Sequence, residues 1–133
     1  MIDSIFVPPN VHFAVGMLVM VASLLALVVA GWSAWKRQPM NGRVHLALIF
    51  FQIVLMVQVL IGIKLLDQGL GALQLYIHFI GGMAPLAFCL FMYWLPTADG
   101  IRKGRIAAGV AALSFVFVLM TFMIGSAYVP GVA

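Results

Sequence analysis

The sequence predicts an all-α integral membrane protein, a four-helix up-down bundle with both termini outside. Three observations predict this fold class. The chain of 133 residues is 65% hydrophobic and only 8% charged, whereas soluble domains average about 25% charged residues. Four apolar runs each reach the roughly 20 residues that a membrane-spanning helix requires. Short polar loops separate the runs, as they do between antiparallel neighbours in a bundle.

The first apolar run is expected to span the membrane over residues 9–35. Two prolines stand at its start, where the missing N–H of proline costs nothing because the first turn of a helix leaves such groups unpaired. Trp32 and Trp35 mark the far end of this run, since tryptophan favours the interface between membrane and water. Residues 1–10 carry one Asp and neither Lys nor Arg, so a cleavable signal peptide is not expected.

The other three spans are expected at residues 44–63, 72–95 and 106–128, so that the 133 residues form a single four-span domain. The last span begins with small residues, which allow close contact between helices in a membrane. Ser114 and Thr121 lie in this span and can bond back to carbonyl groups of their own helix. We recognise no internal repeat along the chain.

Basic residues are distributed unequally between the two sides of the predicted bundle. The loops at residues 36–43 and 96–105 hold six of the seven Lys and Arg residues, whereas Lys64 is the only one on the other side. Cytoplasmic loops carry the excess of Lys and Arg. We therefore expect both loops in the cytoplasm and the protein in a bacterial inner membrane. Because the basic residues lie at helix ends, the net charge of +4 does not indicate a nucleic-acid partner.

The composition excludes several classes of function. The single cysteine, Cys89, excludes a disulfide within the chain and a zinc or iron–sulfur site built from cysteines. A four-span multidrug transporter needs a carboxylate inside the membrane, but the chain has no Glu and its three Asp residues lie outside the expected spans. No nucleophile can be matched with a suitable base, so an independent hydrolase is not expected. A role as a subunit of an oxidoreductase complex stays open.

Two histidines are candidate ligands for a cofactor. His12 lies about one turn inside the first span, and His78 lies about six residues inside the third, roughly 9 Å along its axis. Both spans run from outside to inside, so the two imidazoles are expected at similar depth in the outer leaflet. An ionisable side chain within a span marks a functional site by default. Two histidines on different helices can hold a haem iron from both faces.

Other interpretations of these side chains stay open. His78 could form a polar contact between helices, with Gln58 or Gln74 as its partner. His12 could be a histidine of the headgroup region, and His45 lies at the opposite surface, too far away to join the pair. Histidine also binds the magnesium of chlorophyll, and the amide of Gln58 could meet a quinone carbonyl.

Lys64 has two possible roles. It is the only cation expected on the outer side, so it is the one residue able to meet a haem propionate by charge. It is also followed three residues later by Asp67, at a spacing that allows an ion pair on one face of a helix.

The segment Gln58-Val-Leu-Ile-Gly62, followed by His78 early in the next span, resembles the Gln-x-x-x-Gly helix and the histidine helix of the haem A synthase family. Each half of those proteins is a four-helix bundle with a bis-histidine haem site. His12 and His78 are 66 residues apart, which fits the ligand arrangement of a family half. The resemblance covers roughly residues 11–94 and implies that these histidines bind haem b with Gln58 and Gly62 beside it.

The chain also departs from the pattern of that family. The family places a catalytic Glu one turn before a ligand histidine, where this chain has Pro9, and an Arg after that histidine, where it has Phe13. The second bundle is missing, so oxidation of a haem methyl group is not expected. Val11-His12-Phe13 before an apolar run is also similar to uncharacterised four-span bacterial membrane proteins with a His-Phe-Pro start, although Ala14 stands where they have Pro.

The function expected from these patterns is that of a small b-type membrane cytochrome with a bis-histidine haem in the outer leaflet. It would act in electron transfer or as an accessory subunit of a respiratory or photosynthetic complex. The alternative is a non-catalytic structural subunit of a large membrane complex, without haem or holding chlorophyll or quinone. Helices that are apolar all round and joined by short loops suit burial among other membrane subunits.

Overall fold

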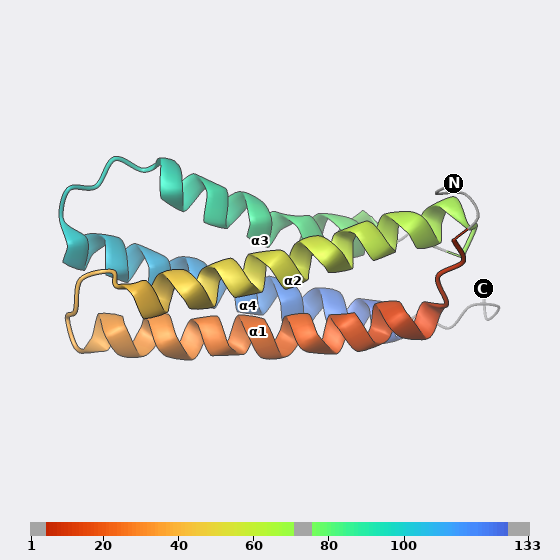
Figure 1. The fold of residues 1–133 in the computed structure, drawn as a ribbon, viewed down its shortest axis with the longest axis horizontal. Coiled ribbons are helices and arrows are strands. Elements are labelled where there is room, and N and C mark those ends of the chain that lie inside the picture. Colours follow the sequence, from red (N-terminus) through yellow and green to blue (C-terminus); the bar gives the residue numbers. More distant parts are fainter. Residues whose placement is uncertain (1–4, 71–75, 128–133) are drawn as a thin grey trace.

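Four long helices make up most of the protein in a computed structural model, which describes residues 5–70 and 76–127. The helices are α1 (Pro9–Trp35), α2 (Gly42–Asp67), α3 (Tyr76–Trp94) and α4 (Gly100–Ala127). They run alternately up and down along one long axis (Figure 1). Each is long and apolar enough to cross a bilayer, which confirms the predicted class of an all-α four-helix bundle. The predicted start of the third span, residue 72, lies outside the described residues.

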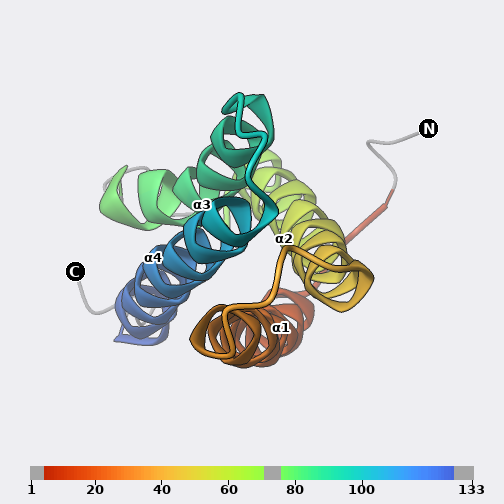
Figure 2. The same cartoon turned by 90° about the vertical axis from the view of Figure 1, so that its left-hand side faces the viewer.

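The four helices are not packed equally. α1 packs closely against both α2 and α4, and α3 packs closely against α4. The contact between α2 and α3 is much smaller. Seen from one end, the first turns of α3 lie well apart from the last turns of α2 (Figure 2). The bundle therefore has three tight seams and one loose seam, between α2 and α3.

Small side chains dominate the buried faces of α1 and α4, the two helices with the most extensive mutual contact. The buried alanines of these two helices are Ala22, Ala26, Ala30, Ala107 and Ala111. Larger core side chains, among them Leu48, Phe51 and Met92, come from α2 and α3. Small residues let two backbones approach closely, and this van der Waals contact holds helices together in lipid, where the hydrophobic effect between them is weak.

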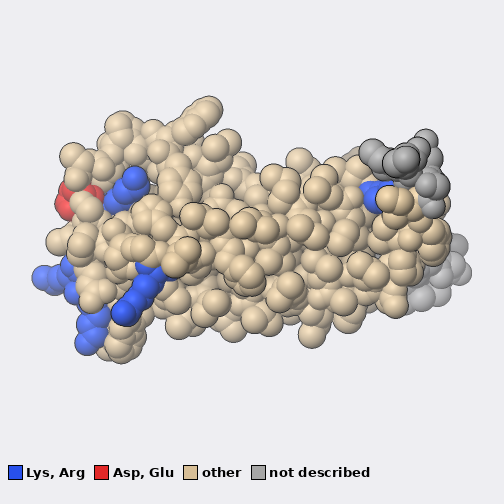
Figure 3. Space-filling view, viewed as in Figure 1, with Lys and Arg blue, Asp and Glu red and all other residues tan. Residues whose placement is uncertain are grey.

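The outer surface of the bundle is apolar between its two ends. Large side chains such as Val21 and Ile53 remain exposed on the outer faces of the helices. Lys and Arg gather at one end of the molecule (Figure 3). Of the seven Lys and Arg residues, only Lys64 lies outside residues 36–43 and 96–105. Trp35 and Trp94, which end α1 and α3 at the basic end, are also exposed. This distribution suits a bilayer around the middle of the bundle and aromatic residues at its interface.

α4 begins six residues earlier than predicted, at Gly100 rather than at residue 106. Asp99 provides the reason, because its Oδ1 accepts hydrogen bonds from the N–H groups of Ile101 (2.9 Å) and Arg102 (3.3 Å). Such a side-chain cap satisfies N–H groups that a helix start leaves unpaired. The second half of the predicted loop 96–105 is therefore helical, and its basic residues project from the first turns of α4.

α2 extends beyond its predicted span at both ends. Asn41 caps its start, because Oδ1 of Asn41 accepts hydrogen bonds from the N–H groups of Arg43 and Val44. At the other end the helix continues to Asp67. It stops where Gly69 adopts a left-handed conformation with φ of 72°, which is a common way for a helix to end.

Replacing Asn41 by Ala is expected to lower the free energy of unfolding by about 1 kcal/mol, because α2 loses its capping acceptor. The amide of Asn41 also donates a hydrogen bond to Oγ of Ser33 in α1, at 3.2 Å. The variant Asn41→Asp keeps the acceptor and loses this donor. Unfolding in detergent micelles measures both variants, and equal losses would show that the contact with Ser33 carries the effect instead of the cap.

Candidate functional site

A cavity of about 320 Å³ lies in the half of the bundle away from the basic loops. All four helices line it, and its volume is at the low end of the roughly 300–1,000 Å³ of ligand pockets. Within the described part of the chain, no Lys, Arg, Asp or Glu lines the cavity, and most of its wall is apolar. The side chains with polar groups on the wall are His12, Gln58, His78, Thr121 and Ser126.

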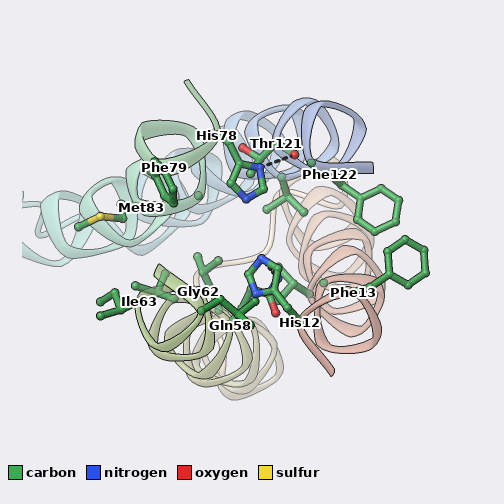
Figure 4. Close-up of a pocket in the computed structure, with 18 of the residues that line it drawn as sticks. His12, Phe13, Gln58, Gly62, Ile63, His78, Phe79, Met83, Thr121 and Phe122 are labelled. Atoms are coloured by element: carbon green, nitrogen blue, oxygen red, sulfur yellow. Dashed lines mark hydrogen bonds between the residues drawn. The ribbon is translucent and has the colours of Figure 1, made fainter. Parts of the chain in front are cut away.

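His12 of α1 and His78 of α3 point toward one another across this cavity (Figure 4). Their ring centroids lie 6.1 Å apart, and the ring planes are inclined by 58°. The prediction that the two rings lie at similar depth in the bundle is confirmed. α1 and α3 do not pack against one another over residues 5–70 and 76–127. α1 and α3 are therefore in contact through side chains and not through close packing of their backbones.

The ring of His78 is held by α4. Its Nδ1 lies 3.0 Å from the backbone carbonyl oxygen of Thr121. A carbonyl oxygen only accepts, so Nδ1 carries the hydrogen of this bond. The lone pair of the neutral ring is then on Nε2, which points toward His12 (Figure 4). A histidine that binds a metal is usually oriented in this way, by a hydrogen bond from its other ring nitrogen.

The ring of His12 is held by α2. Nε2 of Gln58 lies 3.3 Å from Nε2 of His12. Nδ1 of His12 and Oε1 of Gln58 are both buried, and neither has a hydrogen-bond partner among the described residues. A histidine does contact Gln58, as one interpretation of the sequence expects, but it is His12 and not His78. The other expected partner of His78, Gln74, lies outside the described residues.

Glycines allow the backbone to lie close to both rings. A Cβ atom on Gly62 of α2 would lie 3.2 Å from Cε1 of His12, and one on Gly125 of α4 would lie 2.7 Å from Cε1 of His78. α1 and α3 each contribute one further glycine to the wall, Gly16 and Gly82. Glycine has no Cβ, so it lets a backbone approach a ring or a flat ligand.

The residues around the two histidines form a repeat. The pattern His-Phe-x-x-Gly-Met occurs at residues 12–17 and again at residues 78–83. In each case the following helix carries a polar residue and, four positions later, a glycine, and both contact the histidine of their own hairpin. These pairs are Gln58 with Gly62 and Thr121 with Gly125. The chain thus consists of two similar hairpins, α1–α2 and α3–α4, which corrects the expectation that it has no internal repeat.

Two residues of the site on α4 are not predicted from the sequence. The hydroxyl of Thr121 could bond back to its own helix, but its Oγ1 has no hydrogen-bond partner within residues 5–70 and 76–127. The backbone carbonyl of Thr121 is the group that meets His78. Gly125 can be found in the sequence only by searching the last span for another polar residue that is followed four positions later by a glycine, as Gln58 is followed by Gly62.

Lys64 does not line the cavity. Its Nζ lies 2.6 Å from Oδ2 of Asp67, so the two residues form the ion pair that their spacing allows. A role for Lys64 toward a cofactor stays a prediction. His45 lies near the start of α2, at the other end of the bundle, where its ring stacks on Tyr93 with a centroid separation of 6.0 Å.

The lining residues differ between the two sides of the cavity. Between α1 and α4, the ring of Phe13 packs against that of Phe122, with centroids 5.5 Å apart. On the helices of the loose seam, the lining residues Ile63 of α2 and Met83 of α3 are each 56% exposed. Because the contact between α2 and α3 is small, we expect a ligand to enter the cavity between these two helices.

The donor set fits a haem iron better than a bare metal ion. Among the described residues, no group of three or more His, Cys, Asp and Glu could hold a metal, whereas zinc sites use three or four protein ligands. Haem iron needs only axial ligands from the protein. Metal–imidazole bonds are about 2 Å long, so two imidazoles on opposite sides of one metal have centroids roughly 6 Å apart. The centroids of His12 and His78 are 6.1 Å apart.

Comparison of the chain with models of known protein families, with curated proteins and with solved structures found no match. The resemblance to haem A synthases therefore rests on the motif residues alone. The function has to be argued from the cavity and from the side chains that face it.

Proposed function

We propose that this protein is a small b-type membrane cytochrome in which His12 and His78 hold haem b. It acts in electron transfer or as an accessory subunit of a respiratory or photosynthetic complex. The observation that carries the proposal is the pair of imidazoles that face one another across the cavity with centroids 6.1 Å apart. When bound, haem supplies a centre for one-electron redox chemistry.

The residues of this chain would bind and orient the group and exclude water. The carbonyl of Thr121 keeps the hydrogen of His78 on Nδ1 and so leaves Nε2 for the metal. Gly62 and Gly125 leave space beside the two rings. The apolar wall limits the access of water, and solvent exposure is one of the factors that set the potential of a bound haem.

The unequal charge of the two ends supports an orientation in the membrane. We place the loops at residues 36–43 and 96–105 in the cytoplasm, and the cavity and both termini on the outer side of a bacterial inner membrane. On that side Lys64 is the only Lys or Arg, so it is the residue proposed to meet a haem propionate. Exposed apolar side chains and short loops suit other membrane subunits as partners.

A second candidate function is that of a structural subunit without haem. The observation that favours it is that each histidine already has a hydrogen-bond partner on a neighbouring helix, Gln58 for His12 and the carbonyl of Thr121 for His78. Polar contacts of this kind join helices in membranes. Chlorophyll or quinone in the same cavity belongs to this alternative, because magnesium binds imidazole and the amide of Gln58 can meet a quinone carbonyl.

The test is the reduced-minus-oxidised visible spectrum of the purified protein, recorded as isolated and after addition of haemin. We expect sharp b-type bands. A featureless spectrum under both conditions, from protein that circular dichroism shows to be helical, would overturn the cytochrome proposal and favour the structural subunit. Chlorophyll bands in the extracted pigment would instead assign the cavity to a magnesium pigment.

A further inference from the structure

We infer that His78 is the permanent ligand of this site and that His12 is an exchangeable one. With haem bound, His78 would stay in place and His12 would be the side chain that a small neutral ligand could replace. The inference rests on the proposed function, because it concerns the haem that the two histidines are proposed to hold. It is carried by a difference between the two otherwise similar halves of the cavity.

The two hairpins present their histidines in nearly the same way. Each histidine begins a His-Phe-x-x-Gly-Met segment, and each ring rests beside a glycine of the following helix, Gly62 for His12 and Gly125 for His78. If every contact corresponded, the two imidazoles would be equivalent ligands. They differ in the ring nitrogen that the protein uses for its hydrogen bond.

In the hairpin α3–α4 the hydrogen bond uses the nitrogen that a metal does not need. Nδ1 of His78 donates to the carbonyl of Thr121 at 3.0 Å, and Nε2 is left for the metal. A backbone carbonyl within a helix has no side-chain torsion through which it could move away. The ring of His78 is therefore oriented before a ligand arrives, which reduces the ordering that binding requires.

In the hairpin α1–α2 the hydrogen bond uses the nitrogen that would have to bind the metal. Nε2 of Gln58 lies 3.3 Å from Nε2 of His12. If the amide were turned round, its oxygen would accept a hydrogen from the same Nε2, so this atom is occupied in either orientation. Nδ1 of His12 has no partner among the described residues that would orient the ring. Gln58 would therefore compete with a bound metal for Nε2 of His12.

The first test compares haemin binding by the full-length protein and its variants in phosphatidylcholine nanodiscs. We expect His12→Ala to bind haemin within about tenfold of the wild-type affinity and, when reduced, to bind carbon monoxide, because His78 remains. We expect the affinity of His78→Ala for haemin to fall by more than about 100-fold. This loss is larger than the 10–100-fold loss that follows when a residue that only orients a metal ligand is replaced.

The second test measures the competition itself by the rate at which carbon monoxide binds to the reduced protein. Gln58→Leu removes the competing amide, so His12 returns to the metal more readily, and we expect binding to slow by about two- to tenfold, the effect of one hydrogen bond. Gln52→Leu is the matched control on the same helix. The amide of Gln52 bonds to the carbonyl of Leu48 at 3.0 Å and does not line the cavity, so the rate should not change.

The outcomes separate this inference from the proposed function. Equal losses of haemin affinity in the two histidine variants, or a larger loss in His12→Ala, would overturn the inference and leave the cytochrome proposal intact. An unchanged or faster rate in Gln58→Leu would also overturn it, and this measurement does not depend on the folding of His78→Ala. Absence of haemin binding by the wild-type protein would overturn the proposed function and the inference with it.

Discussion

We expect that replacing either His12 or His78 by Ala abolishes the sharp bands of the reduced protein, and that replacing His45 by Ala leaves them unchanged. Such bands require two axial ligands on one haem iron. Of the three histidines, only His12 and His78 line the cavity. His45 is the matched control because it lies at the other end of the bundle, stacked on Tyr93. Reduced-minus-oxidised difference spectra at equal protein concentration measure the effect.

The two substitutions are expected to abolish the bands in different ways. His12→Ala retains haem on a single histidine, with the broad spectrum of a five-coordinate iron, whereas His78→Ala loses most of the pigment. Bands that survived in both variants would show that other side chains hold the pigment. Loss of the bands in His45→Ala as well would show that the spectrum responds to general damage and not to the ligand pair.

Replacing Gly125 by Ala is expected to weaken haemin binding by about 10–100-fold, the usual effect of disturbing the partners of a metal ligand. A Cβ at this position would lie 2.7 Å from Cε1 and 3.0 Å from Nδ1 of His78. Carbon atoms that are not bonded pack at about 3.5–4.0 Å. The ring must therefore move, and its hydrogen bond to the carbonyl of Thr121 is lost. Titration with haemin followed by visible absorption measures the affinity.

A graded series of glycine substitutions tests the reason for this effect. In Gly62→Ala the new atom would lie 3.2 Å from Cε1 of His12, so we expect a smaller loss of affinity. Gly109 lies on the same helix as Gly125, and no atom of the described residues lies within 4 Å of its missing Cβ, so Gly109→Ala should bind haemin like the wild type. If Gly109→Ala lost as much affinity as Gly125→Ala, the cause would be the packing of α4 rather than the space beside His78.

The helices are predictable from the sequence to different degrees. The first predicted span coincides with α1 (Pro9–Trp35), because Pro8 and Pro9 stand at its start and a polar loop follows it. The start of α4 is missed by six residues, because the basic side chains between Gly100 and residue 106 lower the local hydropathy. The capping bonds of Asp99 nevertheless stabilise this polar first segment as helix. Hydropathy locates the part of a helix that lies in lipid and does not locate the part that projects from it.

The sequence predicts how deep the two histidines lie in the bundle. It does not predict which groups form hydrogen bonds with them. The approach of His12 to His78 follows from the position of each residue along its span and from the alternation of the spans. The contact of Gln58 with His12 depends on how α1 and α2 are rotated about their axes. The role of Thr121 is carried by a backbone carbonyl, which every residue has, so no side-chain pattern points to it.

The sequence by itself determined the number of helices, their approximate lengths and their alternating direction. The physical reason is local, because the cost of placing charges and unpaired backbone groups in lipid depends on the composition of each segment. Only the tertiary structure decided which side chains share the cavity. Helices in a membrane are rotated into register by close contact between small residues, and hydropathy does not distinguish such contacts. For this reason the contacts of Gly62 and Gly125 with the two rings could be assigned only once the four helices were packed together, although the repeated His-Phe-x-x-Gly-Met segment is present in the sequence.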